Sequence, residues 1–268
     1  MVVRSGAGGG GAALSSMKGA YSAGAAQWAD GPGRVYGRLA ELLVQFSPTP
    51  LAGASVLDLG SGTGLGSRAA LAAGARVLAA DLSIGMLLAG RDERPPAAVG
   101  DAVALPFREG AFDIVLAPFC MNHLPQPEVG VREVARVARI LVASTYAADD
   151  DHPVKAAVET ALSEIGWTRP AWYDTVKRSM AAWGTVPAAT RVLEQGGMRP
   201  LRVERIEVGF PDLGVGQMVA WRMGLAQSGA FVAGLPPGLR SEAERRAVEL
   251  LGPRPEPLVR RVIFLAAA

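Results

Sequence analysis

The stretch Val56–Gly66, with the sequence VLDLGSGTGLG, decides the fold of this chain. It begins with a short apolar run typical of a strand, passes through four glycines at alternate positions, and continues into Ser67–Ala73, a segment of good helix formers. Glycine suits such a turn because it accepts a positive φ and lets a ligand approach the backbone. The free N–H groups at the start of the helix carry a partial positive charge. We therefore expect a nucleotide-type pocket at the carboxyl end of a first parallel strand.

The spacing of these glycines excludes two common nucleotide motifs. The dinucleotide pattern GxGxxG fails in both registers, because its third glycine would fall at Leu65 or at Ser67. The phosphate loop GxxxxGK[ST] fails because no lysine follows. Asp58 lies two positions before the glycines, where an acid would repel a pyrophosphate but could position a cationic ligand. S-adenosylmethionine (SAM) carries an ammonium and a sulfonium and no phosphate, so it suits this turn.

Four segments, in order, resemble the motifs of the class I SAM-dependent methyltransferases. They are Asp58–Gly64 as motif I, Arg76–Asp81 as the second strand with its ribose-binding acid, Gly100–Phe107 as the adenine-binding turn, and Phe112–Leu124 as the fourth strand with its exit loop. The resemblance implies an α/β fold with a Rossmann-like, doubly wound, seven-stranded sheet. Its order would be 3-2-1-4-5-7-6, with the last strand antiparallel and with helical cap insertions.

The rest of the chain is assigned around this core. Only Ala138–Arg139 separates the predicted helix 128–138 from the fifth strand, where the family usually has a Pro-Gly-Gly-type turn, so we expect a tighter turn or an earlier helix end. The Gly-, Ala- and Ser-rich residues 1–16 predict a flexible tail, and residues 17–268 a single methyltransferase domain. We expect its SAM-binding core at about 50–145 and its cap or acceptor insertions at about 17–47, 146–183 and 211–250.

The resemblance assigns cofactor contacts to ten residues. Asp81 would hold the ribose hydroxyls, because a carboxylate accepts two hydrogen bonds and a vicinal diol donates two; capping of the next helix is the alternative. Asp101 would accept from the adenine amino group beside the Ala102 N–H, or be a surface-turn acid. Met86 would pack on adenine or in the core. The predicted set is Asp58, Gly60, Ser61, Gly62, Asp81, Leu82, Met86, Asp101, Ala102 and Phe119.

Two histidines are the candidate catalytic bases. His123 lies in the exit loop of the fourth strand and would act as a general base or orient the acceptor, since the imidazole pKa lies near working pH. A helix-start residue bonded to the backbone is the equal alternative. His152 is the second candidate; with Lys155 it would present one helical face to an acidic or phenolic substrate, or form a surface pair. Residues 149–151 are three acids without the spacing of a calcium loop, so we predict a solvated turn or helix start and no metal.

Aromatic and titratable residues are dense after the fifth strand, which is typical of a lid over an acceptor pocket. Trp28 and Tyr36, on the N-terminal helices, would close on the methionine end of SAM or simply pack in the core. These side chains favour a hydrophobic or aromatic acceptor, such as a specialised metabolite or a quinone-like precursor. The predicted acceptor-binding set is Trp28, Tyr36, Tyr146, Trp167, Trp172, Tyr173 and Trp221.

The bulk properties narrow the class of partner. The formal net charge is only +2, which implies no broad basic face for nucleic acid. Ala117–Cys120 also replaces the Asn/Asp-Pro-Pro-Tyr loop that a nucleic-acid methyltransferase would have. The single cysteine, Cys120, excludes an internal disulfide and suits the cytoplasm, and no apolar run reaches the length of a membrane span. The sequence is compatible with a homodimer but does not give the oligomeric state.

The sequence thus predicts methyl transfer from SAM to a small-molecule acceptor, with S-adenosylhomocysteine (SAH) as the product. Two alternatives stay open. One is a non-methylating member of the fold that catalyses cyclisation or merely binds SAM. The other is a binding or regulatory protein without chemistry.

Overall fold

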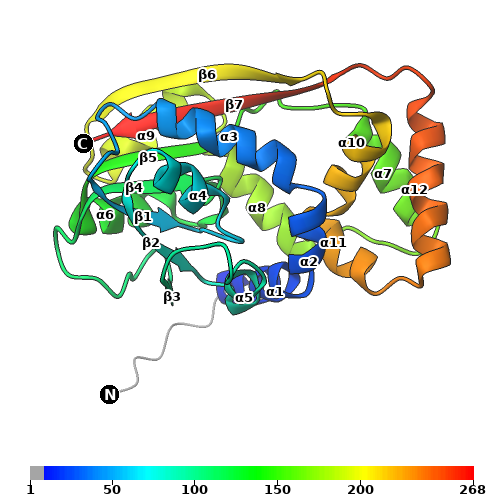
Figure 1. Ribbon diagram of the computed structural model, residues 1–268, viewed down its shortest axis with the longest axis horizontal. Helices are drawn as coiled ribbons and strands as arrows, with labels where there is room; N and C mark the ends of the chain where they lie inside the picture. Colours follow the sequence, from blue (N-terminus) through cyan, green and yellow to red (C-terminus); the bar gives the residue numbers. More distant parts are fainter. Residues whose placement is uncertain (1–8) are drawn as a thin grey trace.

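The computed structural model describes residues 9–268 and shows a mixed seven-stranded sheet flanked by helices (Figure 1). The strand order is β3-β2-β1-β4-β5-β7-β6. The first five strands are parallel, and β7 pairs antiparallel with both β5 and β6. The predicted order and antiparallel last strand are confirmed. The strands are β1 (Ser55–Leu59), β2 (Arg76–Asp81), β3 (Ala97–Val99), β4 (Phe112–Pro118), β5 (Ala138–Tyr146), β6 (Pro200–Phe210) and β7 (Leu258–Ala267).

The central strands are apolar on both faces because each face carries its own core. Val56 of β1 belongs to a cluster with residues of α3 (Gly33–Gln45), whereas the next residue, Leu57, belongs to a cluster with residues of α6 (Pro127–Val137). Strands covered on both sides lose the polar alternation of a half-exposed strand. This doubly wound arrangement leaves the carboxyl ends of β1, β2 and β4 together at one edge of the sheet.

Some helices precede the sheet in the chain, and others, later in the chain, gather at the end of the molecule opposite the chain's C-terminus (Figure 1). The remaining helices are α1 (Gly9–Ala23), α2 (Ala25–Asp30), α4 (Leu65–Ala72), α5 (Ile84–Ala89), the 3₁₀ helix η1 (Met121–His123), α7 (Val154–Ser163), α8 (Ala171–Ala181), α9 (Val186–Gln195), α10 (Val215–Met223), α11 (Ala226–Ala233) and α12 (Pro237–Leu251).

The N-terminal segment differs from the prediction. Residues 9–16, expected in a flexible tail, form the first half of α1, and residues 1–8 lie outside the described residues. Helix α1 packs against α8, α11 and α5, and these contacts offset the low helix propensity of its first glycines. Ser22 fixes the end of α1, because its Oγ lies 2.8 Å from Ser83 Oγ. A Cβ on Gly85 would lie 2.7 Å from Ser22, so α1 and α5 approach closely.

The junction between α6 and β5 is as tight as the sequence requires. Helix α6 ends at Val137, one residue earlier than predicted, and β5 begins at the next residue, Ala138. The backbone of Ala138 is already extended, with φ −144° and ψ 160°. The helix therefore passes directly into the strand without a glycine turn.

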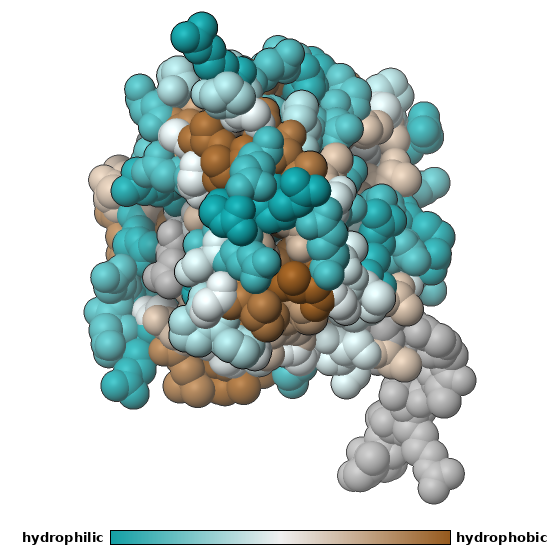
Figure 2. Space-filling view, turned by 90° about the vertical axis from the view of Figure 1, so that its right-hand side faces the viewer, coloured by the Kyte–Doolittle hydropathy of each residue, from teal (hydrophilic) through white to brown (hydrophobic). Residues whose placement is uncertain are grey.

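Helices α7, α10 and α12 form the far end of the molecule (Figure 1). Arg246 of α12 joins Glu164, just beyond α7, through two hydrogen bonds of 2.9 and 3.0 Å. The surface at this end shows hydrophobic patches interrupted by hydrophilic residues (Figure 2). Within residues 9–268, no helix combines the length and apolar character needed to cross a membrane.

Candidate active site

The glycine turn after β1 has the conformation that the sequence predicts. Gly60, Gly62 and Gly64 have φ values of 68°, 54° and 92°, which side chains rarely tolerate. Space also requires glycine here, because a Cβ on Gly60 would lie 2.6 Å from the Cys120 Sγ, and one on Gly62 would lie 3.1 Å from the Met86 side chain. The turn therefore offers a backbone surface without side chains at the edge of the sheet.

Asp81, at the end of β2, organises this edge. One carboxylate oxygen accepts from the Gly62 N–H at 2.8 Å, and the other accepts from the Ser83 N–H at 2.7 Å. The cap of α5 itself is Ser83, whose Oγ accepts from the Met86 N–H at 3.3 Å. Burial raises the pKa of Asp81. Each carboxylate oxygen keeps a further lone pair, and Asp81 lines the cavity described below, so a diol remains able to bind there.

The turn that follows β3 brings a second acid to the same edge. Asp101 Oδ1 accepts from the Val103 N–H at 3.1 Å, and the backbone of Asp101 bridges to Ala104. Gly100, Asp101 and Ala102 all line the cavity. The predicted adenine-binding turn thus lies beside the predicted ribose-binding acid.

Two residues of the predicted cofactor set lie elsewhere. Asp58 is fully buried beneath the start of α4, and its Oδ2 accepts from the Ser67 hydroxyl at 2.6 Å. Burial raises the pKa of Asp58 to about 7. Neither Asp58 nor Ser61, which is 7% exposed, lines the cavity. The expectation that Asp58 contacts a cationic ligand is wrong, because its carboxylate faces Gly66 and Ser67 of α4 instead.

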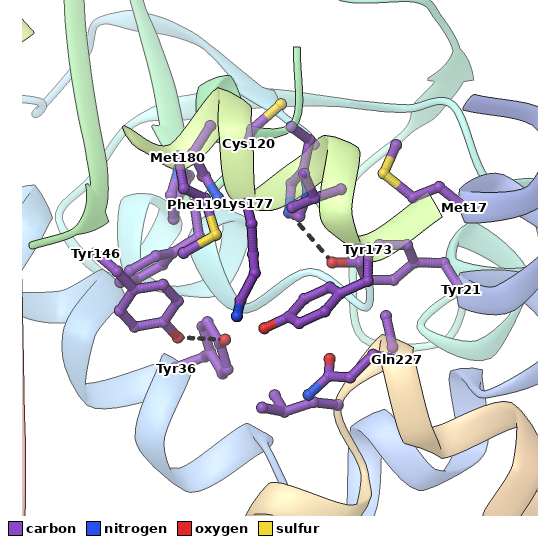
Figure 3. Close-up of a pocket in the computed structure, with 18 of the residues that line it drawn as sticks. Met17, Tyr21, Tyr36, Phe119, Cys120, Tyr146, Tyr173, Lys177, Met180 and Gln227 are labelled. Carbon is purple, nitrogen blue, oxygen red and sulfur yellow. Dashed lines mark hydrogen bonds between the residues drawn. The ribbon is translucent and has the colours of Figure 1, made fainter. Parts of the chain in front are cut away.

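One cavity of about 540 Å³ joins the glycine turn to an aromatic wall (Figure 3). Its size suits a ligand pocket, for which volumes of about 300 to 1,000 Å³ are usual. Most of the predicted cofactor and acceptor residues meet in it. These are Gly60, Gly62, Asp81, Leu82, Met86, Asp101, Ala102 and Phe119 at the edge of the sheet, and Trp28, Tyr36, Tyr146, Trp172, Tyr173 and Trp221 on the acceptor side.

Rings from distant parts of the chain form the aromatic wall. Tyr36 lies 4.9 Å from Trp28 and 5.1 Å from Phe119, and Phe119 lies 4.6 Å from Tyr146, measured between ring centroids. The Tyr146 hydroxyl donates to the Tyr36 hydroxyl (Figure 3). Phe119 has a positive φ of 53°, a strained conformation that its backbone bond to Ser144 helps to hold.

A buried arginine supports this wall from behind. The Arg260 guanidinium lies 4.5 Å from the Tyr146 ring centroid and 4.6 Å from that of Trp221. It forms an ion pair with Asp150, and both side chains are more than nine-tenths buried. The predicted solvated turn is therefore wrong for Asp150. The two neighbouring acids do form exposed pairs, Asp149 with Arg205 and Asp151 with Lys155.

His123 faces the cavity and is bonded to a tyrosine that the sequence did not single out. The Tyr21 hydroxyl lies 3.2 Å from His123 Nε2, and the rings meet edge to face (Figure 3). Burial lowers the pKa of His123 to about 4 and raises that of Tyr21. At neutral pH the phenol is therefore protonated and donates to a neutral imidazole, whose proton is then on Nδ1. This Nδ1 is buried without a partner among residues 9–268.

The prediction of His152 as a second base is contradicted. Its Nδ1 accepts from the Val154 N–H at 3.2 Å, and its Nε2 lies 3.1 Å from the Glu256 carbonyl. Because a carbonyl only accepts, Nε2 carries the proton, and no lone pair remains to act as a base. His152 is 7% exposed and fixes the start of α7, rather than forming the predicted surface pair with Lys155.

Trp167 also departs from its predicted role. It is 6% exposed, and its indole N–H donates to the Gln227 carbonyl at 3.2 Å. It joins α7 to α11 and does not line the cavity, so the prediction of an acceptor contact is wrong. Aromatic density alone does not indicate which face of a helical cap a ring covers.

Among the cavity residues that the sequence did not single out are Arg260, Lys177 and Tyr21, and the first two carry a signal in the sequence. Arg260 occupies an inward position of β7, because Leu258 and Val262 alternate with it and are buried. Lys177 lies one helical turn after Tyr173 on α8, on the same face. Tyr21 carries no such signal, because only the docking of α1 brings it to the cavity.

Comparisons with known proteins now assign the family. A family model described as a methyltransferase domain matches residues 57–140. The demethylmenaquinone methyltransferase of Mycolicibacterium gilvum (strain PYR-GCK) is 32% identical over 197 residues, which cover 68% of this chain and 83% of that protein. The chain belongs to the class I SAM-dependent methyltransferases.

Solved structures agree with this methyltransferase in fold. An N-methyltransferase from Haemonchus contortus, in complex with SAH, has a TM-score of 0.52 at 16% identity and covers 86% of this chain and 52% of its own. The [4+2]-cyclase SpnF has a TM-score of 0.50 at 17% identity and covers 86% of this chain and 79% of its own. At such identities the likeness establishes the fold alone.

Independently of these comparisons, the geometry at this edge of the methyltransferase's sheet fits SAM. The turn presents backbone without Cβ atoms, which is what a closely packed ligand needs. Asp81 has unused lone pairs in the cavity, and Asp101 lies next to it on the neighbouring strand's exit turn. The edge therefore offers a carboxylate to a sugar diol and another to an amino group.

Proposed function

We propose that this methyltransferase transfers the methyl group of SAM to an aromatic or apolar small molecule bound in the cavity. The observation that carries the proposal is the continuity of one cavity from the glycine turn to the aromatic wall. The name of the relative from Mycolicibacterium gilvum, demethylmenaquinone methyltransferase, supports an acceptor with a quinone-like ring.

The cofactor would be held at the edge of the sheet. Gly60 and Gly62 would contact it through their backbone, Asp81 would accept from the ribose hydroxyls, and Asp101 from the adenine amino group, with Met86 packed on the base. When bound, SAM supplies an electrophilic methyl group on a positively charged sulfur.

The acceptor would be held by residues from the predicted cap segments 17–47, 146–183 and 211–250. Their rings would orient a flat molecule and exclude water. Holding two reactants in line at near-contact distance accounts for a large part of the rate of such a transfer. The low pKa of His123 makes it a weak base, so the Tyr21–His123 pair would position the acceptor rather than deprotonate it.

The test is incubation of the protein with SAM and a panel of quinols, naphthols and short polar amines, with detection of SAH and of the methylated product by mass spectrometry. We expect SAH to form in step with a gain of one methyl group on aromatic members of the panel. A preference for the short polar amines would contradict the aromatic acceptor. SAM binding without SAH formation would favour the non-methylating alternative.

For partners and location we propose only what the sequence favours. The near-neutral charge and the cavity favour a small molecule over nucleic acid or a membrane as the partner. The single cysteine, Cys120, favours the cytoplasm. A homodimer stays a prediction that sedimentation can test.

A further inference from the structure

The positive charges that line the cavity differ in their partners. Arg260 is paired with Asp150, Arg222 lies 2.6 Å from Glu159, and Lys155 lies 3.6 Å from Asp151, so these three cations are largely compensated. Among the side chains that the structure describes, the lining cations without an acidic partner within 4 Å are Lys18 and Lys177. Lys18 belongs to α1 and is exposed. Lys177 reaches from α8 into the space in front of the aromatic wall (Figure 3).

The groups around Lys177 are hydrogen-bond donors. Its ammonium lies 5.9 Å from the Tyr173 ring centroid and points toward the hydroxyls of Tyr173, Tyr36 and Tyr146 (Figure 3). Because Tyr146 donates to Tyr36, the proton of Tyr36 stays available to a ligand. Burial raises the pKa of Tyr36 to about 12, which keeps this proton in place at neutral pH. An ammonium donates three bonds and accepts none.

The acids that line the cavity do not cancel this charge. Asp81 and Asp101 lie at the cofactor edge, and Asp150 and Asp151 face their own cations, Arg260 and Lys155. The acceptor side therefore presents one uncompensated ammonium and at least one free phenol proton. A ligand that complements it must supply an oxygen that only accepts, and it binds more tightly when that oxygen is negative.

We propose that the methyl acceptor binds as an anion, an ionised phenol or enol, whose oxygen is held by Lys177 together with the hydroxyls of Tyr36 and Tyr173. This inference rests on the proposed function and names its substrate class. It also explains how the site works without a strong base. Lys177 favours the ionised form of the acceptor, so the proton leaves to solvent rather than to His123.

The methyl transfer then requires no residue of the protein to accept or donate a proton. An electron pair of the anion, on the oxygen or on the conjugated ring carbon, forms the bond to the methyl carbon. The carbon–sulfur bond breaks with its electron pair staying on sulfur, so the negative and positive charges cancel. Where the ring carbon is methylated, its proton leaves to water.

The test uses a phenol that reports its own ionisation. We would saturate the protein with SAH, add 4-nitrophenol, and follow the phenolate absorbance as a function of pH. The neutral ether 4-nitroanisole, which cannot ionise, serves as the control ligand for 4-nitrophenol. We expect the pKa of bound 4-nitrophenol to lie about one unit below that of the free phenol, which corresponds to about a tenfold preference for the anion. Lys177→Met should remove the shift, and Lys177→Arg should keep it.

Arg178→Met is the matched control, because Arg178 lies next to Lys177 on α8, is bonded to Thr175 and does not line the cavity. It should leave the shift unchanged. A shift that persists in Lys177→Met, a preference for 4-nitroanisole, or no binding of 4-nitrophenol at millimolar concentration would each overturn the inference. Calorimetric titration of the same samples with SAH distinguishes a failure of this inference from a failure of the proposed function. Lost anion preference with intact SAH binding refutes the substrate class alone, whereas absent SAH binding refutes the proposed function.

Discussion

The two sides of the cavity are built in opposite ways. The cofactor edge comes from the segments that directly follow β1, β2, β3 and β4, and its residues span about 60 positions of sequence, from Gly60 to Phe119. The acceptor wall draws on Tyr21 near one end of the chain and Arg260 near the other. The first side depends on local backbone geometry and the second on tertiary packing, so substitutions should break them in different ways.

The largest effect is expected behind the acceptor wall. Asp150→Asn leaves Arg260 buried without its partner, and we expect a loss of about 3 to 5 kcal/mol in the free energy of unfolding. Asp149→Asn is the control, because its pair with Arg205 is exposed and should contribute less than about 1 kcal/mol. Denaturant unfolding of both variants measures the difference. Equal losses would show that the wall does not depend on this buried pair.

A slightly smaller effect is expected at the cofactor edge. Gly60→Ala combines strain at a φ of 68° with a Cβ 2.6 Å from Cys120, and we expect a loss of about 3 kcal/mol. Gly53→Ala has a similar φ of 75° but meets nothing within 4 Å, so strain alone should cost about 1 kcal/mol. The difference isolates the contact with Cys120, and thermal unfolding of both variants would reveal it. Indistinguishable variants would contradict the tight packing of the turn.

The last stability effect is a dependence on pH, which is small over any one pH unit. Because burial raises the pKa of Asp58 from its usual 3.8 to about 7, the folded protein retains a proton that the unfolded chain has lost. The favourable contribution is complete below pH 3.8 and disappears as the pH rises to about 7. Asp58→Asn removes this dependence, so its stability relative to the wild type should rise by about 1 kcal/mol per pH unit in that window. A constant difference between the two proteins would contradict a raised pKa.

The contrast between the two sides also explains what the sequence can predict. The position of Gly62, Asp81 and Asp101 at one edge of the sheet can be predicted, because it follows from strand, turn and helix signals within a few residues. The position of Tyr21 cannot, because it depends on how α1 docks onto α8 and α11. The glycines at the start of α1 indicate flexibility by propensity, and packing outweighs that preference.

The direction of individual side chains is the other feature that the sequence does not predict. Asp58 and Trp167 are chemically suited to a ligand, and each turns toward a neighbouring helix instead. Sequence spacing identifies the element but not the partner that it meets. Arg260 shows the opposite case, since the alternation of β7 already places it facing inward.

Calorimetric titration of SAH into the wild type, Asp81→Ala and Asp113→Ala tests the central claim, that the glycine turn and Asp81 form a SAM site. Asp113 is the matched control, because its carboxylate also holds a backbone N–H and a hydroxyl, both of Ser55, but it does not line the cavity. We expect Asp81→Ala to remain folded and to lose about a hundredfold in affinity, while Asp113→Ala binds like the wild type. A wild type that ignores SAH, or a folded Asp81→Ala that binds it as tightly, would contradict the account.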